Sequence, residues 1–434
     1  MSLLEGLHVF AHGVGGRNDL PIPEWQAVWG AVVVLVASFL ALGVLWPQAR
    51  LRRTATGRAF PDGIDRALRF PVGLLRAIVF ALFVVALTAG LFGTDTHVSN
   101  IAPVTVYVIF WVGLVFASAL LGDVWRAVSP WEALGRLADP AQPRPAPAWL
   151  RSGGLAVVPV GAFLWLELAY HDGARPLVLG WAGLSYTVLL LVLARRFGWA
   201  AARRAEGFGV LFGALAALAP VARIDGRLRL RPPFVGLARL EMSAPTVAVL
   251  LVAIGGTAFD GFSRTRFWVN LLSGRAGWEA TIVNTVGLAW IVLLAGLAYH
   301  LACQLGERAT GTPGAAERFG PSLVPILLGY SVAHYFSLLL LEGQAFRSLL
   351  SDPYGRGWDL FGTLGDPINW TLVSPTVVGW VQVVAIVLGH LVAAVVAHDR
   401  AVEAWAPPTA LRSQYPMLAA MVVYTMAALL LVAG

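Results

Sequence analysis

Long apolar stretches recur along the whole chain, and they constrain the fold more than any other feature. A helix needs about 20 apolar residues to cross the hydrocarbon core of a bilayer. Only 13% of the residues are charged and the mean hydropathy is +0.73, whereas a soluble domain has about 25% charged residues. The sequence therefore predicts an all-α, polytopic membrane protein, an integral helical bundle. We expect ten spans, at roughly 27–46, 72–93, 101–121, 153–170, 177–194, 244–259, 281–304, 322–341, 375–397 and 416–433.

A shorter apolar stretch at 207–221 lies between two arginine-rich segments. As a full span it would place one of these segments outside, although basic segments favour the cytoplasm. We expect a re-entrant or interfacial helix, with 195–241 wholly inside. One transmembrane domain, 1–434, is predicted. Ten spans would also allow two halves, 1–206 and 207–434, of inverted topology.

The charge distribution predicts the orientation. The first loop, 47–76, holds seven arginines against Asp62 and Asp65, so it is expected in the cytoplasm, with the N-terminus and the 342–374 loop outside. The net charge of +7 is assigned to cytoplasmic loops and anionic lipid. The predicted partners are therefore the lipid bilayer and a small-molecule or ion substrate. No nucleic-acid partner is expected, and the sequence predicts a multi-pass protein of the plasma membrane.

Several chemistries are excluded by residue types that the chain lacks. Cys303 is the single cysteine and there is no lysine, which excludes a disulfide framework, a thiolate-only metal site, Schiff-base chemistry and a P-loop. A serine-hydrolase elbow at 329–333 is also disfavoured. Ser331 lies in the middle of a predicted span, and Ala333 replaces the last glycine of the motif.

Histidines and carboxylates gather in the predicted outer half. Two histidines four residues apart on a helix can share a zinc-like divalent ion, which needs about three protein ligands. The alternative is that interfacial histidines form hydrogen bonds at the level of the lipid headgroups. The candidate metal ligands are His8, His12, Asp95, His97, Glu167 and His171.

A second set of polar groups favours transport. Asp260 lies between a glycine pair and Gly261 at the end of the short sixth span. This pattern is typical of a broken helix lining a cavity, and a simple surface cap is the alternative. The candidate substrate or ion ligands are Arg17, Asp19, Asp260, His334 and Glu342. They indicate a plasma-membrane transporter or permease, with protons or a divalent cation as the coupling ion.

Three histidines, His300, His390 and His398, belong to the predicted inner half. Two histidines on different helices can ligate a b-type haem. A b-type membrane cytochrome is therefore the lesser alternative, because a histidine in a span more often bonds a neighbouring helix.

Four stretches carry a resemblance to a known family: AHGVGGRNDLPIP, FDGFSRTRFW, SDPYGRGWDLFGT and SPTVVGWVQVVAIVLGHLVAAVVAHDRAV. They resemble polytopic proteins of actinobacteria and archaea often labelled fenitrothion hydrolase, over most of the chain. The label implies hydrolysis of an organophosphate ester. The second hypothesis is therefore a membrane-embedded, metal-dependent hydrolase, in which an outer metal activates water and Arg17 holds a phosphoryl oxygen.

Overall fold

The computed structural model describes residues 22–433, and in this range nine helices are long and apolar enough to cross a membrane. This confirms the all-α, polytopic helical bundle. The long helices are α1 (Glu24–Leu45), α4 (Arg69–Phe92), α11 (Pro176–Phe197), α14 (Ala244–Ser263), α16 (Gly277–Thr310), α20 (Pro375–Ala404) and α21 (Pro407–Ala433). Two further spans, Ile101–Leu121 and Ala315–Ser351, are composite.

The composite spans change helix type along their length. The first consists of α5 (Ile101–Pro103), η3 (Val104–Gly113) and α6 (Leu114–Leu121), and η3 is a π-helix of ten residues. π-Helices are usually single-turn features and often occur at functional sites. The second consists of α17 (Ala315–Phe319), η8 (Gly320–Ser322), α18 (Leu323–Leu341), η9 (Glu342–Gln344) and α19 (Ala345–Ser351).

The fourth predicted span is shorter than expected. It consists of the 3-10 turn η4 (Gly154–Ala156) and α10 (Val157–Leu168), which together form one short apolar helix. A second short apolar helix consists of α13 (Gly207–Leu215) and η6 (Ala216–Leu218). Beyond α10 the chain folds back so tightly that a Cβ on Gly173 would lie 1.9 Å from the Leu166 carbonyl oxygen. α10 and α13 pack against each other and against α14. α13 is largely buried, whereas α10 keeps an exposed face at Val158.

Short helices connect the longer ones. They are α2 (Leu51–Thr54), α3 (Asp62–Ala67), α7 (Val124–Val128), α8 (Pro130–Leu137), α9 (Ala148–Arg151), α12 (Trp199–Ala202) and α15 (Arg266–Leu272), with 3-10 turns η2 (His97–Ser99), η5 (Arg203–Ala205) and η7 (Val235–Arg239).

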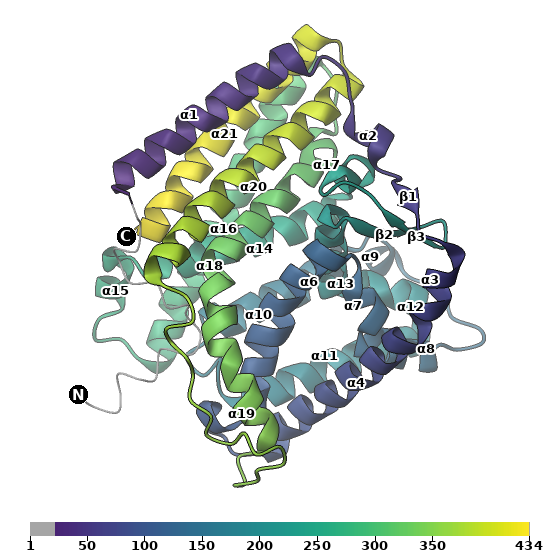
Figure 1. The fold of residues 1–434 in the computed structure, drawn as a ribbon, viewed down its shortest axis with the longest axis vertical. Coiled ribbons are helices and arrows are strands. Elements are labelled where there is room, and N and C mark those ends of the chain that lie inside the picture. Colours follow the sequence, from purple (N-terminus) through teal and green to yellow (C-terminus); the bar gives the residue numbers. More distant parts are fainter. Residues whose placement is uncertain (1–21, 434) are drawn as a thin grey trace.

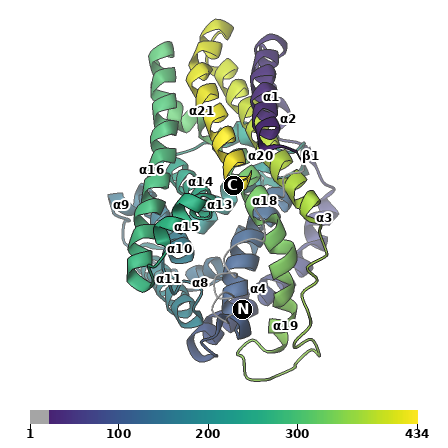
Figure 2. The ribbon, with the colours of Figure 1, turned by 90° about the vertical axis from the view of Figure 1, so that its left-hand side faces the viewer.

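The first helix packs with the last ones. α1 lies along α20 and α21, and α16 also packs on α21 (Figure 1, Figure 2). On the other side of the molecule, α4 packs against α11. The spatial grouping therefore crosses the predicted division at residue 206. α18 and α20 approach closely because both present glycine at their contact, where a Cβ on Gly329 would lie 3.2 Å from the Cα of Gly389.

α14 is the central helix and it is continuous. A Cβ on Gly255 would lie 2.7 Å from the Cα of Val292 in α16, and one on Gly256 would lie 2.7 Å from the Leu164 side chain in α10. The broken-helix interpretation of this glycine pair is therefore wrong. The glycines allow close helix packing, which is their usual role in membrane bundles.

A small antiparallel sheet, which the sequence analysis did not predict, joins two distant loops. Its strands are β1 (Arg58–Ala59), β2 (Val221–Ile224) and β3 (Arg227–Leu230), in the order β1-β3-β2. The β2–β3 turn is Asp225-Gly226, and both residues have positive φ, as a tight hairpin turn requires. β1 pairs with β3 through Ala59 and Arg229. The first loop and the 195–241 segment therefore share one side of the bundle, as the predicted topology requires.

Candidate functional site

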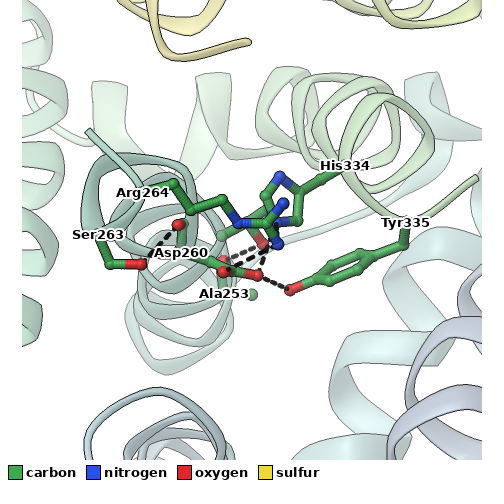
Figure 3. A network of polar contacts seen from close by, with 7 residues as sticks. Ala253, Asp260, Ser263, Arg264, His334 and Tyr335 are labelled. Atoms are coloured by element: carbon green, nitrogen blue, oxygen red, sulfur yellow. Dashed lines mark hydrogen bonds and ion pairs between the residues drawn. The ribbon is translucent and has the colours of Figure 1, made fainter. Parts of the chain in front are cut away.

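A buried carboxyl–histidine contact joins two spanning helices. Asp260 on α14 is 0% exposed, and its Oδ2 lies 2.6 Å from Nε2 of His334 on α18 (Figure 3). So short a contact requires a proton between the two atoms, bonded to either the nitrogen or the oxygen. The Tyr335 hydroxyl donates a further hydrogen bond to the same oxygen at 3.4 Å.

Arg264 completes the network at the end of α14. It follows Asp260 by four residues and so lies on the same helix face. Its Nη2 lies 3.4 Å from Asp260 Oδ1 and 3.2 Å from His334 Nε2. The Arg264 side chain is 29% exposed whereas the Asp260 side chain is fully buried. Arg264 therefore connects a buried carboxylate with the rim of the bundle.

A second carboxyl group, Glu167, lies close to this network. Glu167 is buried on α10, and its Oε2 has no hydrogen-bond partner within residues 22–433. It interacts electrostatically with Asp260 and also with the buried hydroxyls of Tyr107 and Tyr335. α10, α14, α18 and the π-helix η3 thus all contribute to one polar centre.

The charges of this centre determine how many protons it holds. Asp260 and Glu167 contribute two negative charges when ionised, and Arg264 contributes one positive charge. Net charge in a low-dielectric interior is costly. For these described groups neutrality requires one additional proton, on Asp260, Glu167 or His334. The arrangement can therefore hold one proton that several acceptors share.

Glu342 lies at the end of α18. It is buried in η9, and its Oε1 has no hydrogen-bond partner in the described part of the chain. η9 packs against the π-helix η3. The predicted site residues Asp260 and His334 thus meet directly, and Glu342 is a buried polar group on the same span. Arg17 and Asp19 lie outside the described residues.

Two of the predicted outer metal ligands, Asp95 and His171, have other partners in the structure. Asp95 accepts hydrogen bonds from Arg175 Nε at 2.5 Å and from the Leu177 amide at 3.2 Å. His171 Nδ1 lies 2.8 Å from Thr281 Oγ1, and His97 lies in η2. Within residues 22–433 no three His, Cys, Asp or Glu side chains form a group that could hold a metal ion. Because His8 and His12 lie outside this range, the zinc-like site stays a prediction.

The inner histidines are arranged separately. His398 uses both ring nitrogens, with Nδ1 3.2 Å from Gln414 Oε1 and Nε2 3.0 Å from the Trp46 carbonyl oxygen. His390 is buried, with Nδ1 2.9 Å from the Ile386 carbonyl oxygen, and His300 is exposed. His398 has no ring nitrogen left for a haem iron in this arrangement. The cytochrome alternative gains no support from the described residues.

Sequence reasoning missed two members of the site, Arg264 and Tyr335. The sequence could have indicated Arg264 as a site residue, because a cation four residues after a carboxylate at a span end lies on the same helix face. It could not have indicated Tyr335, since aromatic residues are common in membrane spans. The contribution of η3 could not be anticipated either, because the stretch VTVYVIFWVG has no sequence mark of a π-helix.

Comparison with family models, with curated proteins and with solved structures finds no match for this chain. The resemblance to the family labelled fenitrothion hydrolase therefore stays a prediction, and so does the hydrolase activity that this label implies.

Proposed function

We propose that this protein is a plasma-membrane transporter or permease that couples the movement of a small solute or ion to a proton held at Asp260 and His334. The 2.6 Å contact between a fully buried carboxylate and a histidine on a neighbouring spanning helix carries the proposal. Ionisable residues inside membrane spans are costly and usually mark ion or proton pathways.

Arg264 and Glu167 supply the means of exchanging the proton. When the proton leaves the Asp260–His334 pair, the Arg264 guanidinium compensates the charge left on the aspartate. Glu167 is a second acceptor on the α10 side of the same centre. A substrate that displaces Arg264 would therefore favour proton binding, and release of the proton would favour return of Arg264. This exchange links substrate occupancy to protonation.

The proposal is tested with purified protein in liposomes under an inward proton gradient. Uptake is measured across a panel of radiolabelled small solutes, and internal pH is followed with a trapped dye. The matched variants are Asp260→Asn and Asp366→Asn. Asp366 is an exposed aspartate paired with Arg347, outside the buried centre.

We expect gradient-driven uptake of at least one solute by the wild type and by Asp366→Asn. Uptake and its accompanying proton flux should be lost in Asp260→Asn, because an amide cannot cycle between ionised and protonated forms. Equal coupled flux in Asp260→Asn and wild type would refute the site. Absence of any gradient-dependent flux across the panel would count against the transport function itself.

A further inference from the structure

The contact between Arg264 and Asp260 is long for an ion pair. Nη2 of Arg264 lies 3.4 Å from Asp260 Oδ1 (Figure 3), whereas a tight bond between a charged nitrogen and a carboxylate oxygen measures about 2.7–2.9 Å. A guanidinium can hold a planar carboxylate through two parallel hydrogen bonds. A carboxylate that approaches Arg264 from the rim and is held by two nitrogens would therefore form the stronger pair.

The position of the proton affects how firmly the centre holds Arg264. Nη2 of Arg264 also lies 3.2 Å from Nε2 of His334. An imidazole nitrogen accepts a hydrogen bond only while it carries no proton. When the proton that His334 shares with Asp260 resides on Nε2, two donors face each other and the contact with Arg264 is lost. Protonation of His334 therefore loosens Arg264 from the centre.

The charge balance of the centre limits which substrate can enter. Its titratable and charged groups among the described residues are Asp260 and Arg264 on α14, His334 and Tyr335 on α18, Glu167 on α10 and Tyr107 on η3. Two carboxylates, one guanidinium and one proton sum to zero, and the tyrosines add no charge. An anion alone, or a second proton alone, would leave a net charge in a buried site, which is costly. An anion and a proton that bind together keep the centre neutral.

The connection between α14 and α16 favours anions over cations. Residues 261–278 contain three arginines and no carboxylate, although basic residues are disfavoured on the predicted outer side. Arg266 and Arg275 are exposed, and neither has a carboxylate partner in the described part of the chain. By contrast, Arg175 and Arg347 both pair with aspartates. Positive charge that is not compensated nearby attracts anions to the rim and repels cations.

We propose that the substrate of this centre is a small monovalent carboxylate, which Arg264 binds together with uptake of one proton by the centre. The inference rests on the proposed transport function, and it adds a substrate class and a mode of coupling, proton–anion symport. When the carboxylate leaves, Arg264 returns to Asp260 and the additional proton is released. A cation would instead have to pass the arginines and displace the proton already held at the centre.

Binding is measured first, in detergent and without a gradient, as the rise in unfolding temperature that a ligand of the native state produces. The carboxylates are formate, acetate, lactate, pyruvate and benzoate, and the comparison solutes are chloride, methylammonium and pyruvamide, all at constant ionic strength. The variants are Arg264→Gln, Arg264→Lys and the double variant Asp260→Asn with Glu167→Gln. The matched control is Arg347→Gln, because Arg347 is an exposed arginine paired with Asp366.

We expect at least one carboxylate to stabilise the wild type, with an affinity that rises as the pH falls, by up to about tenfold per pH unit because one proton binds with it. The three comparison solutes should not stabilise it. Arg264→Gln should lose the effect, and Arg264→Lys should weaken binding about tenfold or more, since an ammonium cannot form the paired hydrogen bonds. Arg347→Gln should bind like the wild type.

The double variant tests the charge balance directly. It leaves the guanidinium of Arg264 as the net charge of the described groups, so it should bind the carboxylate without pH dependence. Pronounced pH dependence in the double variant, or none in the wild type, would overturn the joint binding of anion and proton. No stabilisation by any of the five carboxylates would overturn the substrate class, and so would equal stabilisation of wild type and Arg264→Gln. If Arg264→Gln fails to fold, Arg264→Lys and the wild-type pH dependence decide.

Transport of the carboxylate that binds is measured second, in liposomes with an inward proton gradient. Uptake and internal acidification should exceed those of liposomes that contain Arg264→Gln. Binding that meets every expectation without gradient-driven uptake would refute the transport function but not the carboxylate site. Proton-coupled transport of a cation or a neutral solute, without carboxylate binding, would support the transport function and overturn this inference.

Discussion

His334 Nε2 and Asp260 Oδ2 lie 2.6 Å apart although their residues are 74 positions apart in the chain. The contact links α18 to α14 at a point where Asp260 is completely buried. A buried charge that loses its partner is strongly unfavourable. The pair should therefore contribute to stability as well as to the proposed proton exchange.

A double-mutant cycle measures this coupling. We expect Asp260→Asn and His334→Gln each to lower the free energy of unfolding by about 1.5–3 kcal/mol, because each removes a hydrogen bond to a charged group. The double variant should lose less than the sum, with a coupling of about 1–3 kcal/mol. Equilibrium unfolding in mixed micelles provides the four values.

The control cycle uses Asp366→Asn and Arg347→Gln. These residues form an exposed ion pair at 3.3 Å, and exposed pairs couple by less than about 1 kcal/mol. A coupling energy between Asp260 and His334 no larger than that of the control pair would contradict a tight buried interaction.

The two glycines before Asp260 should differ in their tolerance of alanine. A Cβ on Gly255 would meet the backbone of Val292, whereas a Cβ on Gly256 would meet only the end of the Leu164 side chain, which can rotate. Gly255→Ala should therefore cost about 1–3 kcal/mol through overpacking. Gly256→Ala should cost less than about 1 kcal/mol, since alanine also favours helix. Thermal unfolding of the purified variants checks this order, and the reverse order would contradict the packing of α14.

The sequence predicts the helical bundle well because hydropathy acts locally. Each span can be recognised from its own apolar residues, and arginine in the connecting loops predicts the orientation. Helix ends are less predictable: α16 extends to Thr310, beyond the predicted end at residue 304, because a polar turn can continue a helix outside the apolar layer. The role of a glycine is not local, so the pair at 255–256 could be interpreted as a break until its neighbours on α10 and α16 were known.

The site was predictable only where one residue type carries the signal. Asp260 and His334 stand out because ionisable residues are rare in apolar spans. Their pairing follows from the packing of α14 on α18, which no sequence pattern specifies. Asp95 and Glu167 also stand out as carboxylates of the predicted outer half, but Asp95 pairs with Arg175 and Glu167 interacts electrostatically with Asp260. Candidate ligands that share a predicted side of the membrane need not converge.

The β-sheet provides a test of the membrane topology. Because β1 pairs with β3, single cysteines at positions 58 and 227 should react from the same side, predicted to be the cytoplasm. A cysteine at position 366 should react from outside. The background is Cys303→Ala, which removes the single native cysteine. Impermeant maleimide is added to intact cells and to lysed cells.

We expect external labelling at 366 in intact cells, and labelling at 58 and 227 only after lysis. External labelling at 227 alone would contradict the sheet. External labelling at both 58 and 227 would preserve the sheet but reverse the predicted orientation.

Glu206 should make the stability depend on pH. It precedes α13, where its carboxyl lies over Gly209 and 3.5 Å from the Tyr186 hydroxyl. Burial raises the pKa of Glu206 to about 8 from its ordinary value of 4.5. Between these values the folded protein retains a proton that the unfolded chain releases. The contribution to stability is therefore complete below the unfolded pKa and is lost as the pH rises through the folded pKa.

Glu206→Gln keeps a neutral side chain of the same shape at every pH, so it should remove this dependence. Between about pH 5 and 8, the wild type should lose up to about 1.4 kcal/mol per pH unit more than the variant. The control is Glu279→Gln, at an exposed position in the first turn of α16, which should keep the wild-type slope. Thermal unfolding in detergent across this pH range gives the three profiles. Parallel profiles for wild type and Glu206→Gln would show that Glu206 is already ionised in the folded protein at neutral pH, contrary to its burial beside Tyr186.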